Sequence, residues 1–198
     1  MDLEDMINKV PADLDPKVGE MLISAPMMSD PNFCRTAVLV IDREREGAHL
    51  GLVLNRELDL PVSSILADWP NADKINLFHG GPVELDRLFM LHRLGDKVSG
   101  SFEIMPGLYT GGNTDDLRKC FDEESDLHTK IRFFLGYAGW AKGQLTSEIL
   151  QNSWAVNTNP DSASLFAGSG FSYWDREVRS LGHEYRSWLN LPIHPSLN

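Results

Sequence analysis

The sequence predicts an α+β fold in a single domain, with mainly antiparallel β-sheet. Two strand–turn–strand segments predict antiparallel hairpins, and helical segments lie between the strands without a regular βαβ alternation. The chain has 198 residues, 42% of them hydrophobic, and no internal repeat, low-complexity tract or linker divides it. One domain of this length buries a sizeable core without disulfides.

The first half of the predicted sheet starts with a strand at residues 20–26, which Pro26 ends. Residues 36–42, TAVLVID, have apolar side chains on both faces and predict a central strand buried on both sides. The charged turn REREGAH separates this strand from a second buried strand at residues 50–55. The pair predicts an antiparallel hairpin.

The middle of the chain predicts a second hairpin at residues 74–94, KINLFHGGPVELDRLFMLHRL, in which the glycines form the turn. A short helix is expected before it, at residues 61–69, because Pro61 suits the first turn of a helix. Residues 100–112 predict one weaker strand that ends at a glycine pair.

Three helices are expected in the second half. Asn113 is suited to cap a helix at residues 114–124, and Leu145 and Ile149 lie one turn apart in a helix at residues 141–152. Strands are expected at residues 131–140 and 154–158. The C-terminal helix has an aromatic and aliphatic stripe that favours burial against the core over a partner surface: Phe171, Trp174, Val178, Leu181, Tyr185 and Trp188.

Two features are expected inside this C-terminal helix. Ser172 and Asp175 have the spacing of a capping box. Gly182 lies within the helical pattern, where a glycine costs roughly 1 kcal/mol relative to alanine. The pattern therefore predicts one continuous helix across Gly182.

The composition of the chain argues against several classes of function. The net charge is −11 and the pI about 4.9, and no cluster of Lys and Arg is present, so direct nucleic-acid binding is not expected. Residues 1–18 predict an acidic arm or a short helix before the main domain at 19–198, with no secretory signal pattern. No apolar run reaches membrane-spanning length. Two cysteines without a CxxC motif indicate a reduced, cytoplasmic protein.

The common catalytic motifs are absent. The sequence contains no G-x-S-x-G elbow with the correct context, no phosphate-binding P-loop, no dinucleotide-binding fingerprint and no S-x-x-K motif. The six histidines include no pair at helical ligand spacing, and the cysteines have no neighbouring cysteine. No metal site or cofactor is therefore predicted.

Three loops contain residues with possible chemistry. The segment His79–Pro82 has two glycines that suit either an anion nest or a tight turn, and the turn is favoured. Cys34 stands beside Arg35, which can activate a thiol, although a small core residue is the favoured interpretation. Arg56 can clamp a carboxylate ligand or pair with a surface acid, and the surface pair is favoured.

Four blocks in this order resemble one known family: MLISAPMMSDPNFCRTAVLV, GAHLGLVLNRELDLPV, FHGGPVELDRLFMLH and GYAGWAKGQLTSEILQNSW. They are similar to the AlgH (YqgE) family of bacterial proteins, often described as transcriptional regulators, from about Gly19 to the C-terminal helix. The matching residues are Pro26, Asp30, Phe33, Gly51, Leu52, Asn55, Arg56, His79, Gly80, Gly81, Pro82, Val83, His92, Gly136, Ala138, Gly139, Trp140, Gln144, Leu145, Glu148 and Trp154. The chain departs from the family at Glu57, where a proline is usual, and at Thr146, where a glutamate is usual.

The resemblance implies curled, bifurcated β-sheets flanked by helices, and a regulatory role through a protein or small-ligand contact. The alternatives are an enzyme, either a hydrolase or a redox-responsive protein that uses Cys34, and a DNA-binding protein. The candidate binding surface comprises Asn55, Arg56, His79, Gly80, Gly81, Trp140 and Gln144. Because loops on a rigid scaffold often carry function, Arg56, His79 and Trp140 are expected to converge on one concave surface.

Overall fold

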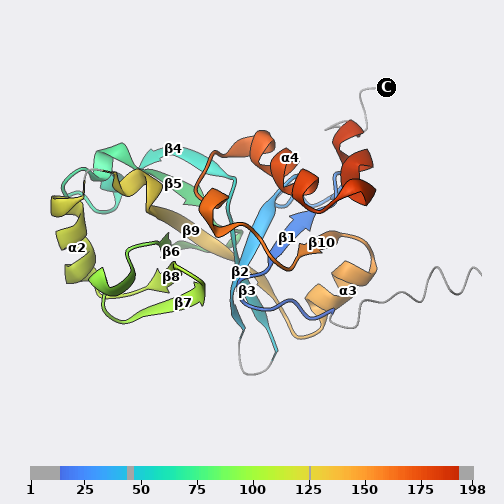
Figure 1. Cartoon of the computed structure of the whole chain (residues 1–198), viewed down its shortest axis with the longest axis horizontal. Helices are drawn as coiled ribbons and strands as arrows, with labels where there is room; N and C mark the ends of the chain where they lie inside the picture. Colours follow the sequence, from blue (N-terminus) through green and yellow to red (C-terminus); the bar gives the residue numbers. More distant parts are fainter. Residues whose placement is uncertain (1–13, 44–46, 125, 192–198) are drawn as a thin grey trace, which may run out of the picture.

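The computed structural model describes residues 14–43, 47–124 and 126–191, and its centre is one ten-stranded sheet (Figure 1). The strands are β1 (Met21–Ser24), β2 (Ala37–Arg43), β3 (His49–Val53), β4 (Glu57–Pro61), β5 (Asn76–His79), β6 (Val83–His92), β7 (Ser101–Met105), β8 (Leu108–Gly111), β9 (Ile131–Trp140) and β10 (Trp154–Asn157). The helices are α2 (Thr114–Glu123), α3 (Gln144–Leu150) and α4 (Gly170–Ser180). Short 3-10 turns are η1 (Val62–Ser64), η2 (Ala72–Lys74), η3 (Gly95–Lys97), η4 (Leu127–Thr129), η5 (Ser162–Ser164) and η6 (His183–Asn190).

The sheet branches at β9. The main path runs β10-β1-β2-β3-β9-β6-β8-β7, and β5 and β4 extend the sheet from the edge of β9 that β3 also borders. The main path curls back on itself, because a Cβ atom at Gly19, just before β1, would lie 2.7 Å from the carbonyl oxygen of Ile104 in β7. This mainly antiparallel, curled sheet confirms the predicted fold class.

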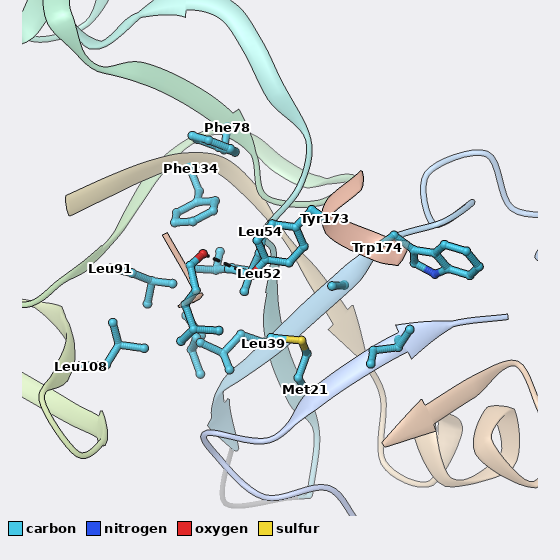
Figure 2. Close-up of a cluster of buried hydrophobic side chains, with 14 of the residues drawn as sticks. Met21, Leu39, Leu52, Leu54, Phe78, Leu91, Leu108, Phe134, Tyr173 and Trp174 are labelled. Carbon is cyan, nitrogen blue, oxygen red and sulfur yellow. Dashed lines mark hydrogen bonds between the residues drawn. The ribbon is translucent and has the colours of Figure 1, made fainter. Parts of the chain in front are cut away.

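The interior of the curl is the main hydrophobic core (Figure 2). Side chains from the neighbouring strands β1, β2 and β3, namely Met21, Leu39 and Leu52, meet there with Phe134 of β9. Helix α4 closes one side of this core with Trp174 and Tyr173, and the Tyr173 hydroxyl donates to the carbonyl oxygen of Leu165 at 3.1 Å. Two further clusters cover the other faces, one beneath α2 and one beneath α3.

Local predictions were confirmed where the determining contacts are close in sequence. Strands β2 and β3 form the expected antiparallel hairpin. Helix α2 begins after Asn113, whose side-chain oxygen accepts bonds from the amides of Asp115 and Asp116. The strand expected at residues 131–140 is β9, which borders β3, β5 and β6.

The second predicted hairpin is wrong. Both of its strands exist as β5 and β6, but β9 lies between them, parallel to β5 and antiparallel to β6. The glycine segment therefore crosses the backbone of β9 instead of forming a tight turn. A Cβ atom at Gly80 would lie 2.2 Å from the carbonyl oxygen of Gly136, so only glycine allows this crossing.

Two neighbouring predictions were also wrong in detail. The helix expected at residues 61–69 is limited to the turn η1, and β4 precedes it as a strand that pairs with β5. The single strand expected at residues 100–112 is a hairpin, in which β7 pairs with β8 around Pro106 and Gly107. Proline followed by glycine with positive φ suits a tight turn, and this local signal was available in the sequence.

The continuous C-terminal helix is also wrong, because the chain breaks at Gly182. This residue has φ 114° and ψ −174°, outside the helical region, and it separates α4 from η6. The capping box is not formed: Ser169 occupies the N-cap position, and the Ser172 hydroxyl donates to the carbonyl oxygen of Ser169. Tyr185 and Trp188, which follow the break, are partly buried and pack against the core.

Residues 1–13 and the C-terminal residues 192–198 lie outside the described residues, so the predicted N-terminal arm is largely outside them as well. Residues 14–191, apart from the two short gaps, share one branched sheet and its flanking helices (Figure 1).

Candidate functional site

Asn55 is a buried structural link, with 2% of its surface exposed. Its side-chain oxygen accepts a bond from the amide of Ala37, and its side-chain nitrogen donates to the carbonyl oxygens of Arg35 and Gly170. Its own carbonyl oxygen accepts from the amide of Gly170. These bonds tie the β2–β3 hairpin to the first residue of α4 and occupy the amide group that was expected to face a ligand.

Arg56 and His79 are neighbours in the structure. The amide of His79 donates to the carbonyl oxygen of Arg56 at 2.7 Å. Burial lowers the pKa of His79, and the positive charge of Arg56 lowers it further. The Arg56 guanidinium donates to the carbonyl oxygen of Cys34 at 2.6 Å, so its observed partner is the main chain and not a surface acid.

Cys34 lies half-buried beside this pair. The guanidinium of Arg35, which was expected to act on the thiol, donates to the carbonyl oxygen of Leu191 and lies 4.8 Å from the Trp174 ring centre. Its position is fixed by these two contacts. Cys34 and Cys120 are both free thiols, and Cys120 is buried.

The glycine pair at the end of β5 completes this corner of the sheet. The amide of Gly80 donates to Leu135 of β9, and its carbonyl oxygen accepts from Val53 of β3. Gly80 therefore joins both strands at the point where the sheet branches, and Gly81 packs against the Tyr137 backbone. Because the amide of Gly80 already has a partner, that group cannot contribute to an anion nest.

Trp140 and Gln144 lie elsewhere, in a network around the carboxylate of Glu148. One oxygen of Glu148 accepts from the indole nitrogens of Trp140 and Trp154 at 2.9 and 2.8 Å, and the other accepts from Gln144. Trp140 is 3% exposed and also stacks on Phe33. The network fixes α3 against β9 and β10.

The structure thus brings Asn55, Arg56, His79, Gly80 and Gly81 together at the branch of the sheet and separates them from Trp140 and Gln144. His79 pairs with Leu135 in β9, whereas Trp140 is at the far end of that strand, opposite His49. The buried indole of Trp140 does not line a concave surface shared with Arg56 and His79.

A groove on the β4–β5 side contains charged residues that were not part of the candidate binding surface. It encloses about 270 Å³ and is lined by Glu57, Lys74, Ile75, Asn76, Phe78, His128, Ile131, Arg132 and Gly168. A second hollow of about 260 Å³ adjoins it, because Lys74, Ile75 and His128 line both. The second hollow also has acidic residues: Asp122, Glu123 and Glu124.

Arg132 is the most buried cation of the groove, with 5% of its surface exposed. Its guanidinium donates to the carbonyl oxygens of Leu54, Phe166 and Gly168 at 2.7–2.8 Å and lies 4.3 Å from the Phe78 ring centre. Burial lowers its pKa. Arg132 therefore fixes the loop before α4 to the end of β3, and it does so through neutral partners.

Glu57 also lines the groove. Its carboxylate accepts from the side chains of Asn76 at 3.0 Å and Ser169 at 2.7 Å. These two hydrogen bonds hold the pKa of Glu57 below its ordinary value. The proline that is usual in the AlgH family could not make these bonds, so the departure at Glu57 places a carboxylate in the groove.

One signal in the sequence pointed to this groove. Arg132 stands within IRFFL, at the start of the most apolar run of the chain, where a charged residue requires an explanation. Lys74, Asn76 and His128 gave no such signal, because isolated polar residues near strand ends are common at any protein surface.

One serine–histidine contact has the distance expected of a catalytic pair, since the Ser101 hydroxyl lies 3.1 Å from His92 Nε2. The hydrogen bonds give it a structural role. His92 Nε2 lies 3.1 Å from the carbonyl oxygen of Gly111, and Nδ1 accepts from the amide of Leu94 at 3.4 Å. The proton is therefore on Nε2, and Ser101 donates to Val98, so His92 has no free lone pair to accept the serine proton.

Two kinds of feature are absent from residues 14–43, 47–124 and 126–191. No group of three or more His, Cys, Asp or Glu side chains within them is arranged to hold a metal ion. Among the helices of these ranges, none combines the length and apolar character needed to cross a membrane.

The comparisons with known proteins agree with the fold. The AlgH-like family model matches residues 21–186. UPF0301 proteins of Bacteroides thetaiotaomicron and Parabacteroides distasonis are 37% and 36% identical, over 92% and 94% of this chain and 92% and 93% of theirs.

Two solved structures are similar. The AlgH protein from Pseudomonas aeruginosa has a TM-score of 0.68 and 29% identity, covering 93% of this chain and 97% of that one. A protein from Corynebacterium diphtheriae has a TM-score of 0.71 and 24% identity, covering 87% of this chain and 91% of that one. With the branched sheet and the matched sequence blocks, these findings show that the chain belongs to the AlgH-like family.

Proposed function

We propose that this protein is a cytoplasmic, non-enzymatic binding protein that acts as a regulator through contact with a small ligand or a protein partner. The groove between β4, β5, η4 and the loop before α4 is its ligand site. One observation carries this proposal: a hollow of about 270 Å³ has a buried guanidinium, a lysine, a histidine and a bonded carboxylate in its lining. Pockets with a few convergent polar groups are the usual form of small-molecule sites.

The groove is favoured over the branch of the sheet because of how the side chains are used. Asn55 and Gly80 are occupied by main-chain hydrogen bonds there, and Arg56 donates to Cys34. In the groove, Lys74 and His128 are exposed side chains at the junction of the two hollows. They are therefore accessible to a ligand.

Direct DNA binding is not proposed. A net charge of −11 opposes binding to a phosphate backbone, and the groove is too small for a duplex. A regulatory effect on transcription would therefore pass through a second molecule.

The experiment screens the purified full chain for small-molecule binding by thermal shift against a metabolite library, together with native mass spectrometry of the gently purified protein. We expect at least one compound to raise Tm saturably, and the double variant Lys74→Ala with His128→Ala to lose most of that shift. Lys142→Ala, at an exposed position in the turn before α3, is the matched control. If nothing binds, or if duplex DNA binds with a steep salt dependence, the proposal is overturned.

The enzyme alternative predicts different behaviour. A redox-responsive thiol at Cys34 would be alkylated much faster than a free cysteine at neutral pH, and its oxidation would change the protein reversibly. We expect Cys34 to react at an ordinary or slower rate, and the buried Cys120 to react only on unfolding. Mass spectrometry of a time course of alkylation measures both rates.

A further inference from the structure

The groove contains positive charge that the neighbouring carboxylates do not neutralise directly. Arg132 is buried and donates to three carbonyl oxygens, which carry no full charge. Its nearest carboxylate in the groove, that of Glu57, is held by Asn76 and Ser169. A buried cation without a directly bonded counter-ion favours an anion in the adjacent space.

Lys74 adds to this charge. Its ammonium group donates to the side-chain oxygen of Asn71 at 2.7 Å, a neutral acceptor. The lysines around α2 differ from it, because Lys130 contacts Glu124 and Asp126 and Lys119 contacts Asp116. Lys74 therefore lies at the rim of the groove with a neutral hydrogen-bond partner, and within the described residues no carboxylate forms an ion pair with it.

From these observations, and resting on the proposed binding function, we propose that the groove binds a small molecule through one anionic group, a carboxylate or a phosphate. Arg132 is at the base of the site, and Lys74 and His128 are at its rim. Lysine ammonium and arginine guanidinium groups form charge-assisted hydrogen bonds with both kinds of anion. The site is then a locally positive region on a chain whose net charge is −11.

The adjoining hollow restricts the rest of the ligand. Asp122 and Glu123 are exposed acids in its wall, and Lys74 and His128 line both this hollow and the groove. A second anionic group that extended into this hollow would be repelled. The part of the ligand away from Arg132 is therefore neutral or cationic.

The test uses four probes with the same ring and different charge: benzoate, phenyl phosphate, benzyl alcohol and benzylamine. Binding to the full chain is measured at low salt by NMR titration or isothermal calorimetry. We expect benzoate, phenyl phosphate or both to bind saturably, and the alcohol and amine to bind at least tenfold more weakly. Comparison of the two anions distinguishes a carboxylate site from a phosphate site.

Variants locate the site. Lys74→Gln removes one charge at an exposed position and should weaken binding of the anionic probe about five- to tenfold. Lys142→Gln, also at an exposed position, should leave the affinity for the probe unchanged. His128→Gln provides a second rim variant with little risk to folding, because that side chain is exposed. Arg132 variants are not required, since loss of its three main-chain bonds affects folding as well.

The outcomes separate this inference from the proposed function. Equal binding of all four probes, preferred binding of the alcohol or amine, or anion binding that Lys74→Gln and His128→Gln leave unchanged overturns the anion site. If library compounds bind the groove but the anionic probes do not, the anion site is wrong and the binding function stands. If neither the probes nor any library compound binds, both proposals fail.

Discussion

At the scale of single residues, several matched family positions form internal hydrogen bonds. Asn55 satisfies one amide and two carbonyl oxygens with its side chain, and Glu148 accepts from two indoles and a glutamine. The hydrogen bonds of Asn55 and those of Glu148 each join elements that are separate in the sequence. Residues that resemble a binding motif in the sequence can therefore be the residues that hold the fold together.

Asn55→Ala tests this role. The substitution leaves the amide of Ala37 and the carbonyl oxygen of Arg35 without their side-chain partner in a buried place, and it also removes the part-buried bond to Gly170. We expect the free energy of unfolding to fall by about 2–4 kcal/mol, since each buried unsatisfied group costs about 1–3 kcal/mol. Urea denaturation of the variant and of the exposed control Asn159→Ala measures the difference. Equal stability of the two variants would contradict the structural role.

At the scale of elements, the branch of the sheet depends on a close backbone crossing. Gly80→Ala would place a Cβ atom 2.2 Å from the carbonyl oxygen of Gly136, and neither backbone can move without breaking the bonds to Leu135 and Val53. We expect a loss of more than about 3 kcal/mol or a failure to fold.

Gly143→Ala is the control for this crossing. Gly143 has φ 78° and nothing within 4 Å of its Cβ position, so its alanine variant should lose only about 1 kcal/mol through backbone strain. Soluble yield and urea midpoints of the two variants provide the comparison. A Gly80→Ala variant as stable as Gly143→Ala would show that the crossing is not constrained.

Substitution of Gly182 by alanine distinguishes a continuous C-terminal helix from the observed break. The two structures predict opposite changes in the stability of the protein. In a continuous helix, Gly182→Ala would stabilise the protein by about 1 kcal/mol. In the observed conformation, φ 114° and ψ −174°, alanine is strained, and we expect destabilisation by about 1–3 kcal/mol. Thermal unfolding of this variant and of the exposed control Ser187→Ala decides the sign.

These elements also show what the sequence could predict. The β2–β3 hairpin and the Asn113 cap depend on residues that are close along the chain, so their patterns were sufficient. The strand between β5 and β6 comes from residues 131–140, about forty positions later, and no local pattern contains this information. The groove has the same origin, because Glu57, Lys74 and Arg132 come from three distant segments.

At the scale of the whole molecule, acidic pH should act through one buried and one half-buried histidine, His92 and His79. Burial lowers the pKa of both His92 and His79 below the ordinary value of 6.5. As the pH falls below 6.5, these histidines become protonated in the unfolded chain before they do so in the folded protein. The unfolded state then binds more protons, so the free energy of unfolding decreases as the pH falls from about 7 toward the folded-state pKa values.

His92 offers the clearest test, because its side chain is fully buried and its hydrogen bonds require the neutral ring. A second proton on Nδ1 would remove the acceptor for the amide of Leu94. We expect His92→Gln to be less stable than the wild type at pH 7.5, and to lose less additional stability between pH 7.5 and 5.5. The exposed variant His183→Gln should keep the wild-type pH slope. Urea denaturation at several pH values measures these slopes, and identical slopes for the wild type and His92→Gln would exclude His92 as a source of the acid sensitivity.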